Sequence, residues 1–372
     1  VDTTNTEAYE FYLKAKHKYE KRENTDDTEI ARGLLRKAIE LDDNLLVSKD
    51  LLGWSYIHTG DYDKAMEIFT FALEQAEGIG DKYSMGNSLN SIGSVYKIQG
   101  GDYDKALDYY ERSLAIREKI GDKYGVGQSL NNIGIVYWSK GDYDLAIDYH
   151  ERSLEVYVEL GNKYGMGYSL YNNGIVHSSK GDYDKALDYY SRSLAIREEI
   201  GDKRGMGNSL NSIGSEYKIQ GGDYDKALDY YERALTIQEE IGDKLGMGYS
   251  LVGIGDVYDE KGNYEKTLEY LEKSLSIQKE IGYKGLELDT TTYLYLTYKH
   301  LGKDYDIKDI YTLIKDKQNI EYALNLRLYQ LLEDKSYLET AFNQVQEKAS
   351  AMDNTAKFLS YPIPKAIVEE WE

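Results

Sequence analysis

Three groups of residues in this chain have side-chain types and spacings that could support phosphate binding, acid–base catalysis or metal binding: glycine pairs, carboxylate pairs and histidines. The segment Gly125-Val126-Gly127 opens a predicted helix, as a phosphate loop does, but no strand precedes it and no Lys-Ser/Thr follows it. Asp102 and Asp104 could act as general acid and base, but such pairs recur in every repeated unit, which suits helix capping better. The five histidines lack the spacing of metal ligands. We therefore expect no enzyme activity, catalytic residue, metal site or cofactor.

A repeated ten-residue segment at positions 101–110 organises most of the sequence. Its first Tyr returns in steps of 40 or 41 residues, at Tyr62, Tyr103, Tyr143, Tyr183, Tyr224, Tyr264 and Tyr305. A second marker, Gly-Asp-Lys or a near variant, keeps the same period at Gly80, Gly121, Gly161, Gly201, Gly242 and Gly282. One period shared by two markers predicts a solenoid, in which each unit buries its apolar face against its neighbours.

Each unit reads as two helices, with residues 82–120 as the model. The first helix has an apolar stripe at helical spacing, formed by Met85, Leu89, Ile92 and Tyr96. Gly100 and Gly101 end this helix, and Asp102 is placed to cap the next one. The second helix turns inward a set made of Tyr103, Ala106 or Leu107, Tyr110, Leu114 and Ile116. Gly121 suits a left-handed C-cap.

The units differ in how closely they follow this model. We expect two divergent repeats in residues 1–80, five extended repeats in 81–283, divergent repeats in 284–352 and a capping helix in 353–372. Outside the regular region the predicted helices cover residues 7–22, 27–41, 44–59, 62–77, 319–333 and 337–352. These add up to about nine helix pairs and a C-terminal cap in one elongated domain, 1–372. Residues 86–116 and 207–237 are almost identical and stand three units apart, which indicates duplication of a three-repeat block.

Composition narrows the classes of partner. The formal net charge of −21 argues against nucleic-acid binding, which needs clustered positive charge, and an acidic surface repels anionic lipid. No apolar run approaches the ~20 residues of a membrane span. The absence of cysteine permits a reducing compartment, and we expect a cytoplasmic location. The first residue is Val1 rather than Met, which suggests a piece of a longer protein.

The order Leu89, Ile92-Gly93, Tyr96, Ala106 and Tyr110 resembles the tetratricopeptide repeat. The chain departs from the usual pattern in three ways. The small residue late in the second helix is usually Ser, the Pro that closes the usual repeat is absent, and each unit is longer than the usual ~34 residues. In this it is similar to the extended repeats of kinesin light chain and of the Leu-Gly-Asn adaptors of spindle orientation. The resemblance implies an all-α, right-handed solenoid whose concave groove holds an extended or helical peptide.

The two ends carry a narrower resemblance. Residues 5–9, 30–35 and 42–44 and the tail 358–364 look like the C-terminal repeat region of bacterial signalling proteins that begin with a class III adenylate or guanylate cyclase. This resemblance implies a regulatory region without the cyclase's own catalytic residues.

The tetratricopeptide alignment implies which first-helix residues line the groove, at fixed positions around the repeat Gly. The peptide-binding set is Asn90, Lys97, Asn131, Asn132, Trp138, Tyr171, Asn172, Asn211, Lys218, Asp256 and Asp259. A ladder of Asn amides suits a peptide backbone because each amide both donates and accepts hydrogen bonds. The alternative is that these Asn side chains bridge neighbouring helices or face water.

Charge changes sign along this predicted groove. Lys97 and Lys218 give way to Asp256, Asp259 and Glu260, so a basic segment of a bound peptide could be oriented there. A solvated acidic helix face would give the same pattern.

The fifth repeat breaks the apolar pattern. It has Asn173 and His177 where its siblings have Ile and Tyr. The substitutions indicate either a functional feature or repeat drift with a satisfied buried hydrogen bond. Taken together, the sequence predicts a protein or peptide recognition module, and the alternative is a structural spacer or self-associating homo-oligomer.

Overall fold

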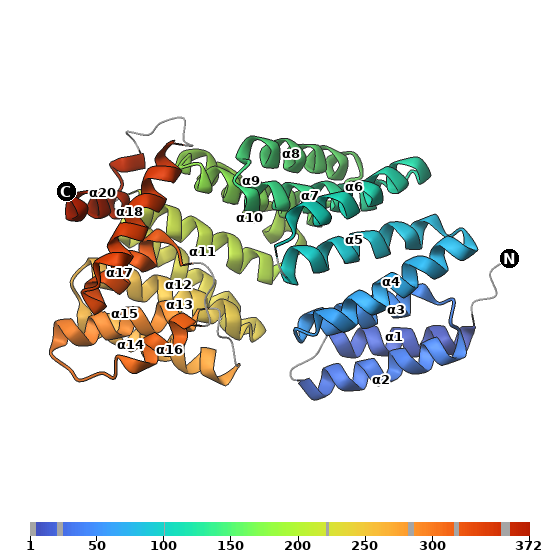
Figure 1. Cartoon of the computed structure of the whole chain (residues 1–372), viewed down its shortest axis with the longest axis horizontal. Coiled ribbons are helices and arrows are strands. Elements are labelled where there is room, and N and C mark those ends of the chain that lie inside the picture. Colours follow the sequence, from blue (N-terminus) through green and yellow to red (C-terminus); the bar gives the residue numbers. More distant parts are fainter. Residues whose placement is uncertain are drawn as a thin grey trace. The chain divides into compact units, whose positions relative to one another are not determined.

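The chain folds into α-helices arranged as successive hairpins (Figure 1). The computed structural model describes residues 5–20, 25–99, 101–220, 223–281, 286–315, 320–350 and 358–372. Within these ranges there are nineteen helices and no strand. The predicted all-α solenoid fold is confirmed, as is the count of nine helix pairs and a terminal helix for the part of the chain that is described.

Two compact units divide the chain, Val1–Gly165 and Met166–Glu372. Helix α9 (Lys163–Ser179) contains the boundary. The single elongated domain with divisions near residues 80, 283 and 352 stays a prediction, and residues 283, 284, 352 and 353 lie outside the described ranges.

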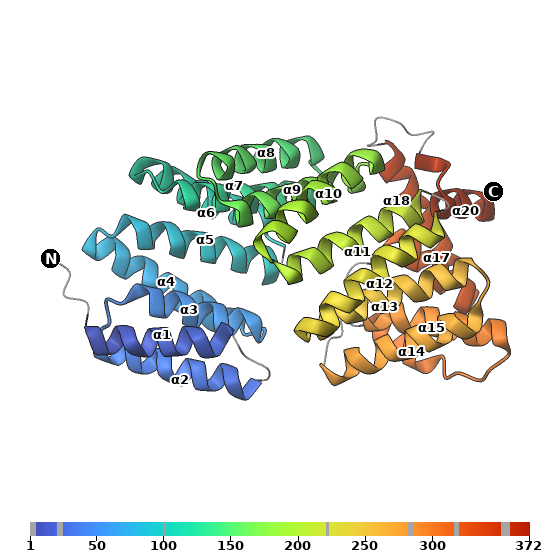
Figure 2. The ribbon, with the colours of Figure 1, turned by 180° about the vertical axis from the view of Figure 1, so that it is seen from behind.

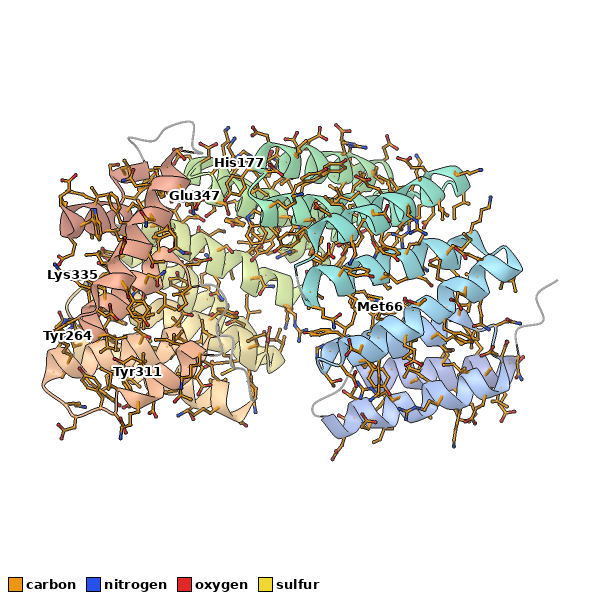
Figure 3. All side chains as sticks on the ribbon, in the orientation of Figure 1. Met66, His177, Tyr264, Tyr311, Lys335 and Glu347 are labelled. Atoms are coloured by element: carbon orange, nitrogen blue, oxygen red, sulfur yellow. The ribbon has the colours of Figure 1, made fainter. Side chains whose placement is uncertain are left out.

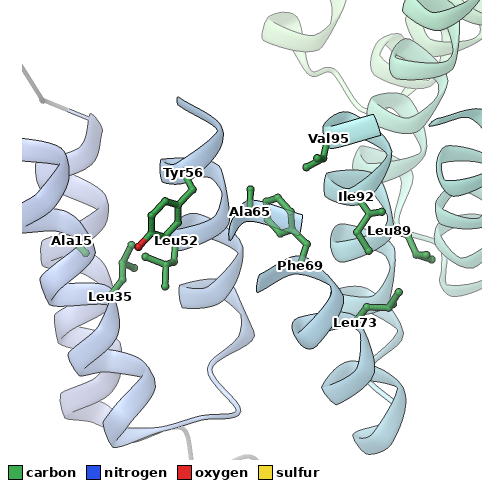
Figure 4. Packing of buried hydrophobic residues seen from close by; sticks show 10 residues of the cluster. All are labelled: Ala15, Leu35, Leu52, Tyr56, Ala65, Phe69, Leu73, Leu89, Ile92 and Val95. Carbon is green, nitrogen blue, oxygen red and sulfur yellow. The ribbon is translucent and has the colours of Figure 1, made fainter. Parts of the chain in front are cut away.

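The first unit consists of four hairpins, which Figure 2 shows from the opposite side. Their helices are α1 (Thr6–Glu20), α2 (Thr25–Leu41), α3 (Leu46–His58), α4 (Tyr62–Ile79), α5 (Lys82–Gln99), α6 (Tyr103–Ile120), α7 (Lys123–Lys140) and α8 (Tyr143–Glu159). Phe69 of α4 is fully buried in a cluster with Leu52 of α3 and Ile92 of α5 (Figure 4). The second helix α4 therefore packs between two first helices, as the predicted stripe requires.

The second unit continues the hairpins and ends in α20. Its helices after α9 are α10 (Tyr183–Ile200), α11 (Lys203–Ile219), α12 (Tyr224–Ile241), α13 (Lys244–Glu260), α14 (Tyr264–Glu280), α15 (Glu287–Leu301), α16 (Lys308–Lys315), α17 (Tyr322–Leu332), α18 (Lys335–Ser350) and α20 (Pro362–Trp371). The predicted pair 319–333 and 337–352 corresponds to α17 and α18, although residues 319 and 352 lie outside the described ranges.

The C-terminal helix covers apolar surface, as predicted. Phe358 and Ile367 are buried in one cluster with Leu338 of α18. Tyr183, the first residue of α10, joins this cluster, and its ring lies 4.6 Å from that of Tyr361. The start of α20 therefore packs against a helix about 180 residues earlier in the chain.

Local signals fix the helix ends. Asp102 caps α6 by accepting a hydrogen bond from the Lys105 amide at 3.2 Å. Gly121 ends α6 with φ of 72°, the left-handed conformation that glycine adopts without a Cβ clash. Both caps were predicted. Of the doubled glycines, Gly100 lies outside the described ranges, together with residues 221 and 222.

The glycines that resemble phosphate loops are close-packing positions. A Cβ on Gly125 would lie 2.7 Å from the Arg117 side chain, and one on Gly127 would lie 2.7 Å from the Tyr157 ring. The prediction that these glycines serve packing is confirmed.

Candidate functional site

A cavity of about 280 Å³ lies in the second unit. It is near the lower end of ligand pockets, which span roughly 300–1,000 Å³. Its walls come from α10 to α13, α15, α17 and α20, and consist of Tyr183, Lys218, Ile219, Tyr224, Val252, Asp256, Glu260, Leu286, Asp289, Tyr293, Glu321, Tyr322, Ala323, Arg327, Tyr361, Ile363 and Pro364. First helices of successive hairpins form one wall, and the start of α20 contributes another.

One buried carboxylate joins three of these helices. Lys218 of α11 forms an ion pair with Asp256 of α13, and the Arg327 Nη2 atom of α17 lies 3.4 Å from Asp256 Oδ1. The side chains of Lys218, Asp256 and Arg327 are 14%, 10% and 15% exposed. Buried charges are tolerated when they are paired, and breaking such a pair is costly.

Aromatic rings complete the surroundings of this ion-pair group. The Arg327 guanidinium carbon lies 3.6 Å from the centroid of the Tyr293 ring. The Tyr224 hydroxyl donates a hydrogen bond to Glu260 Oε2 at 3.5 Å. Burial, and next the charge of Asp256, raise the pKa of Asp259 above its usual range. Carboxylates and rings are therefore concentrated around α13.

Among the predicted groove residues, Lys218 and Asp256 line the cavity, whereas others in the second unit bridge helices. The Tyr171 hydroxyl lies 3.2 Å from Ser212 Oγ, which joins α9 to α11. Asn211 Oδ1 accepts a hydrogen bond from Ser250 Oγ at 2.8 Å, which joins α11 to α13. Asn172 is 6% exposed, and its Nδ2 atom has no hydrogen-bond partner.

Three predicted residues of the first unit also bridge helices. Asn132 Nδ2 of α7 donates to Asn90 Oδ1 of α5 at 2.9 Å. Asn131 is 1% exposed and accepts a hydrogen bond from His150 Nδ1 at 2.9 Å. These bonds are the helix bridging that the sequence left open as the alternative.

Two larger side chains of the first unit are more accessible. Trp138 is 37% exposed, and Lys97 is partly buried, which lowers its pKa. A ligand-binding role for these residues, for the bridging Asn and Tyr residues and for Asp259 stays a prediction.

A metal site and a membrane-spanning helix are both absent from the residues that the structure describes. No group of three or more His, Asp or Glu side chains there is arranged to hold a metal ion. None of the described helices is long and apolar enough to cross a membrane.

Comparison with family models decides the family. The tetratricopeptide repeat model matches residues 45–119, 84–159, 125–199, 165–240 and 208–280, which together span more than half of the chain. The chain belongs to the tetratricopeptide repeat family. A Sel1 repeat model also matches residues 23–43. A search of curated proteins finds no match to this tetratricopeptide chain.

Solved structures with the same tetratricopeptide architecture are similar at low sequence identity. A Rap protein in complex with competence and sporulation factor is 14% identical with a TM-score of 0.59, and the alignment covers 99% of this chain and 96% of that one. The apo quorum sensor NprR of B. thuringiensis is 16% identical with a TM-score of 0.55, covering 99% and 98%. A signal transduction ATPase with a tetratricopeptide repeat sensor from Pyrococcus horikoshii is 18% identical with a TM-score of 0.60, covering 91% and 55%. At these identities the similarity concerns the fold.

The departures from the tetratricopeptide pattern in the fifth repeat keep part of its packing. His177 stacks on Tyr189 with ring centroids 5.2 Å apart, as Tyr137 stacks on Tyr149 in the preceding repeat. Figure 3 labels His177 on α9. Asn173 Nδ2 donates to the Ser169 carbonyl at 3.2 Å, while its Oδ1 atom has no partner. The buried hydrogen-bonding capacity of Asn173 is thus half satisfied.

A stronger departure escaped the sequence analysis. Glu216 is 2% exposed and occupies the position that is Val95, Val136, Val176 and Val257 in the other four extended repeats. Burial raises the pKa of Glu216 to about 7, against the opposing effects of a Ser178 hydrogen bond and the charge of Lys348 on α18. Comparing the two nearly identical repeats residue by residue would have found it.

The raised pKa of Glu216 predicts that the free energy of unfolding depends on pH. Its folded pKa of about 7 is above the ordinary value of 4.5, so the folded chain retains a proton that the unfolded chain releases between these values. The resulting stability is present below about pH 4.5 and is lost as pH rises through about 7. We expect Glu216→Gln to remove a fall of about 2–3 kcal/mol in the free energy of unfolding between pH 5 and 8. Urea titrations of wild type and variant at each pH measure the difference.

The control for this experiment is Glu198→Gln, because Glu198 is exposed on α10 of the same unit. That variant should retain the wild-type pH profile. Parallel profiles for wild type and Glu216→Gln would contradict the assignment.

The cavity residues of the C-terminal part were also missed. Arg327 and Tyr361 lie beyond Gly302, where the repeat pattern decays, so no sibling position identified them. Their helices were predicted, but the meeting of their side chains with Lys218 and Asp256 in one cavity is a tertiary feature that a repeat register does not contain.

Proposed function

We propose that the chain is a non-catalytic recognition module and that the cavity of its second unit binds a peptide segment of a partner. The observation that carries this proposal is the cavity itself, which places a charged group, five Tyr side chains and apolar contacts from α20 in one concave site. Concave sites with a few convergent polar groups are typical of ligand binding. The tetratricopeptide family supports protein or peptide recognition as the general activity.

Two of the similar structures support a peptide-sensing role. The Rap structure is described as a complex with competence and sporulation factor, and NprR is described as a quorum sensor. This comparison supports the proposal that the chain acts as a regulatory region of a bacterial signalling protein in the cytoplasm, the role that the resemblance of its two ends to cyclase-linked repeats implies. Sequencing the complete reading frame tests that context, and a frame without any signalling domain would argue against it.

A cavity-filling variant tests the binding site. Ala323 lines the cavity, so Ala323→Phe places a ring inside it and should weaken binding of peptides selected from a random displayed library by about tenfold or more. Fluorescence anisotropy on the full chain measures the affinity, and circular dichroism checks the helical content.

The matched control is Ala366→Phe, because Ala366 is exposed on α20 and is not part of the cavity wall. It should bind the selected peptides as wild type does. Failure to select any peptide, together with a mass that rises with concentration in ultracentrifugation, would replace this proposal with the self-association alternative.

A further inference from the structure

The cavity wall carries an excess of negative charge. Its four carboxylates are Asp256, Glu260, Asp289 and Glu321, and its two cations are Lys218 and Arg327, which gives a formal charge of −2. A partly enclosed site with an excess of one sign of charge favours ligands of the opposite sign, because low-dielectric walls weaken the screening by water.

Both cations of the wall are directed at a single carboxylate. Lys218 and Arg327 each pair with Asp256, and Arg327 also lies over the Tyr293 ring. Glu260, whose side chain is exposed, accepts its hydrogen bond from the neutral Tyr224 hydroxyl. The wall cations therefore offset Asp256 most strongly, and the negative potential persists towards the exposed carboxylate of Glu260.

The aromatic and apolar residues of the wall suit the charged head and the methylene stem of a basic side chain. Five tyrosines line the cavity, and aromatic faces attract ammonium and guanidinium groups. Val252, Ile363 and Pro364 supply apolar surface, which the methylene stem of a long basic side chain covers favourably.

We infer that the cavity receives one positively charged group of a peptide, an ammonium or a guanidinium, and that Lys218 competes with this group for Asp256. This inference rests on the proposed peptide-binding function and adds the chemistry that the ligand must carry. It also makes Lys218 a specificity-determining residue, because its ion pair must be weakened or shared when the ligand cation enters.

The duplicated repeat provides an internal comparison for Lys218. Lys97 occupies the same position in the nearly identical third repeat. The residue that corresponds to Asp256 in the following repeat is Ile135, so Lys97 faces no equivalent carboxylate there. The partner carboxylate, and not the position of the lysine in the repeat, therefore distinguishes Lys218 from Lys97.

The test uses the full chain and four pools of fluorescent random hexapeptides. The pools contain one fixed Arg or one fixed citrulline, each with a free or an acetylated N-terminus. We expect pools with a cation to bind about tenfold more tightly than the acetylated citrulline pool. The free citrulline and acetylated Arg pools distinguish a terminal ammonium from a guanidinium as the source of the charge.

Variants of the wall then give opposite expected shifts. Lys218→Met should tighten binding of the cationic pools about tenfold because Asp256 loses a competitor, while Lys279→Met, at an exposed lysine of α14 outside the cavity wall, should leave it unchanged. Glu260→Gln keeps the hydrogen-bond acceptor for Tyr224 but removes a charge, so it should weaken binding several-fold.

Each contrary result has a separate meaning. Equal binding of all four pools, still abolished by Ala323→Phe, would overturn the cation preference and leave the proposed function standing. Weaker binding of the cationic pools by Lys218→Met would overturn the competitor role. Absence of binding by every pool would overturn this inference and the peptide-binding proposal together.

Discussion

Replacing Arg117 with Ala is expected to lower the free energy of unfolding by about 3–5 kcal/mol. Arg117 is 2% exposed, and its Nη1 atom donates to the Gly125 carbonyl at 2.8 Å and to Ser129 Oγ at 3.0 Å. Its Nη2 atom donates to Asn87 Oδ1 at 2.7 Å. One side chain of α6 thus holds α5 and α7, and truncation would leave buried acceptors without donors. Urea denaturation followed by circular dichroism measures the loss.

The chain itself provides the control substitution, because Gln stands at the equivalent position in two later repeats. Gln278 Nε2 donates to Thr290 Oγ1 of the next first helix at 2.8 Å, and Gln238 Oε1 accepts from Ser250 Oγ at 2.6 Å. Arg117→Gln should therefore cost clearly less than Arg117→Ala. Equal losses would show that the guanidinium packing, rather than hydrogen bonding between hairpins, determines the stability.

Arg117 also shows what the sequence could and could not predict. Helix starts and ends were predictable because Asp102 and Gly121 act on backbone groups within a few residues of themselves. The burial of an arginine was not, since it depends on Gly125 in the next helix and on Asn87 in the preceding one. The Gly-rich segments were predicted as packing positions, but not the side chains that fill the space they leave.

For the candidate site, too, the sequence predicted which residues share a helix face but not which partners they contact. The alignment with family positions predicted Lys218 and Asp256, which line the cavity, because both belong to regular repeats. It also predicted Asn131, whose Oδ1 atom accepts a hydrogen bond from His150 in the second helix of the same hairpin. A repeat register identifies the face of a helix, whereas the identity of the opposing residue decides whether an amide remains available to a ligand.

Introducing a single methyl group at Gly134 is expected to destabilise the first unit. A Cβ there would lie 2.7 Å from His150 Cε1 and 2.8 Å from its Nδ1 atom. The ring is 1% exposed and hydrogen-bonded to Asn131, so it cannot move away without breaking that bond or displacing its neighbours. We expect Gly134→Ala to lower the free energy of unfolding by about 1–3 kcal/mol, as overpacking does. Urea denaturation of the full chain measures the change.

The contrasting substitution is Gly78→Ala in α4 of the same unit. A Cβ at Gly78 would have no heavy atom within 4 Å, so the only effect is the better helix propensity of Ala. This variant should be more stable than wild type by about 0.5–1 kcal/mol. Opposite signs for the two variants would show that the repeat glycine exists for close approach between helices, because a propensity effect alone would stabilise both. If Gly134→Ala were also stabilising, the His150–Asn131 contact would not be the rigid element that its burial implies.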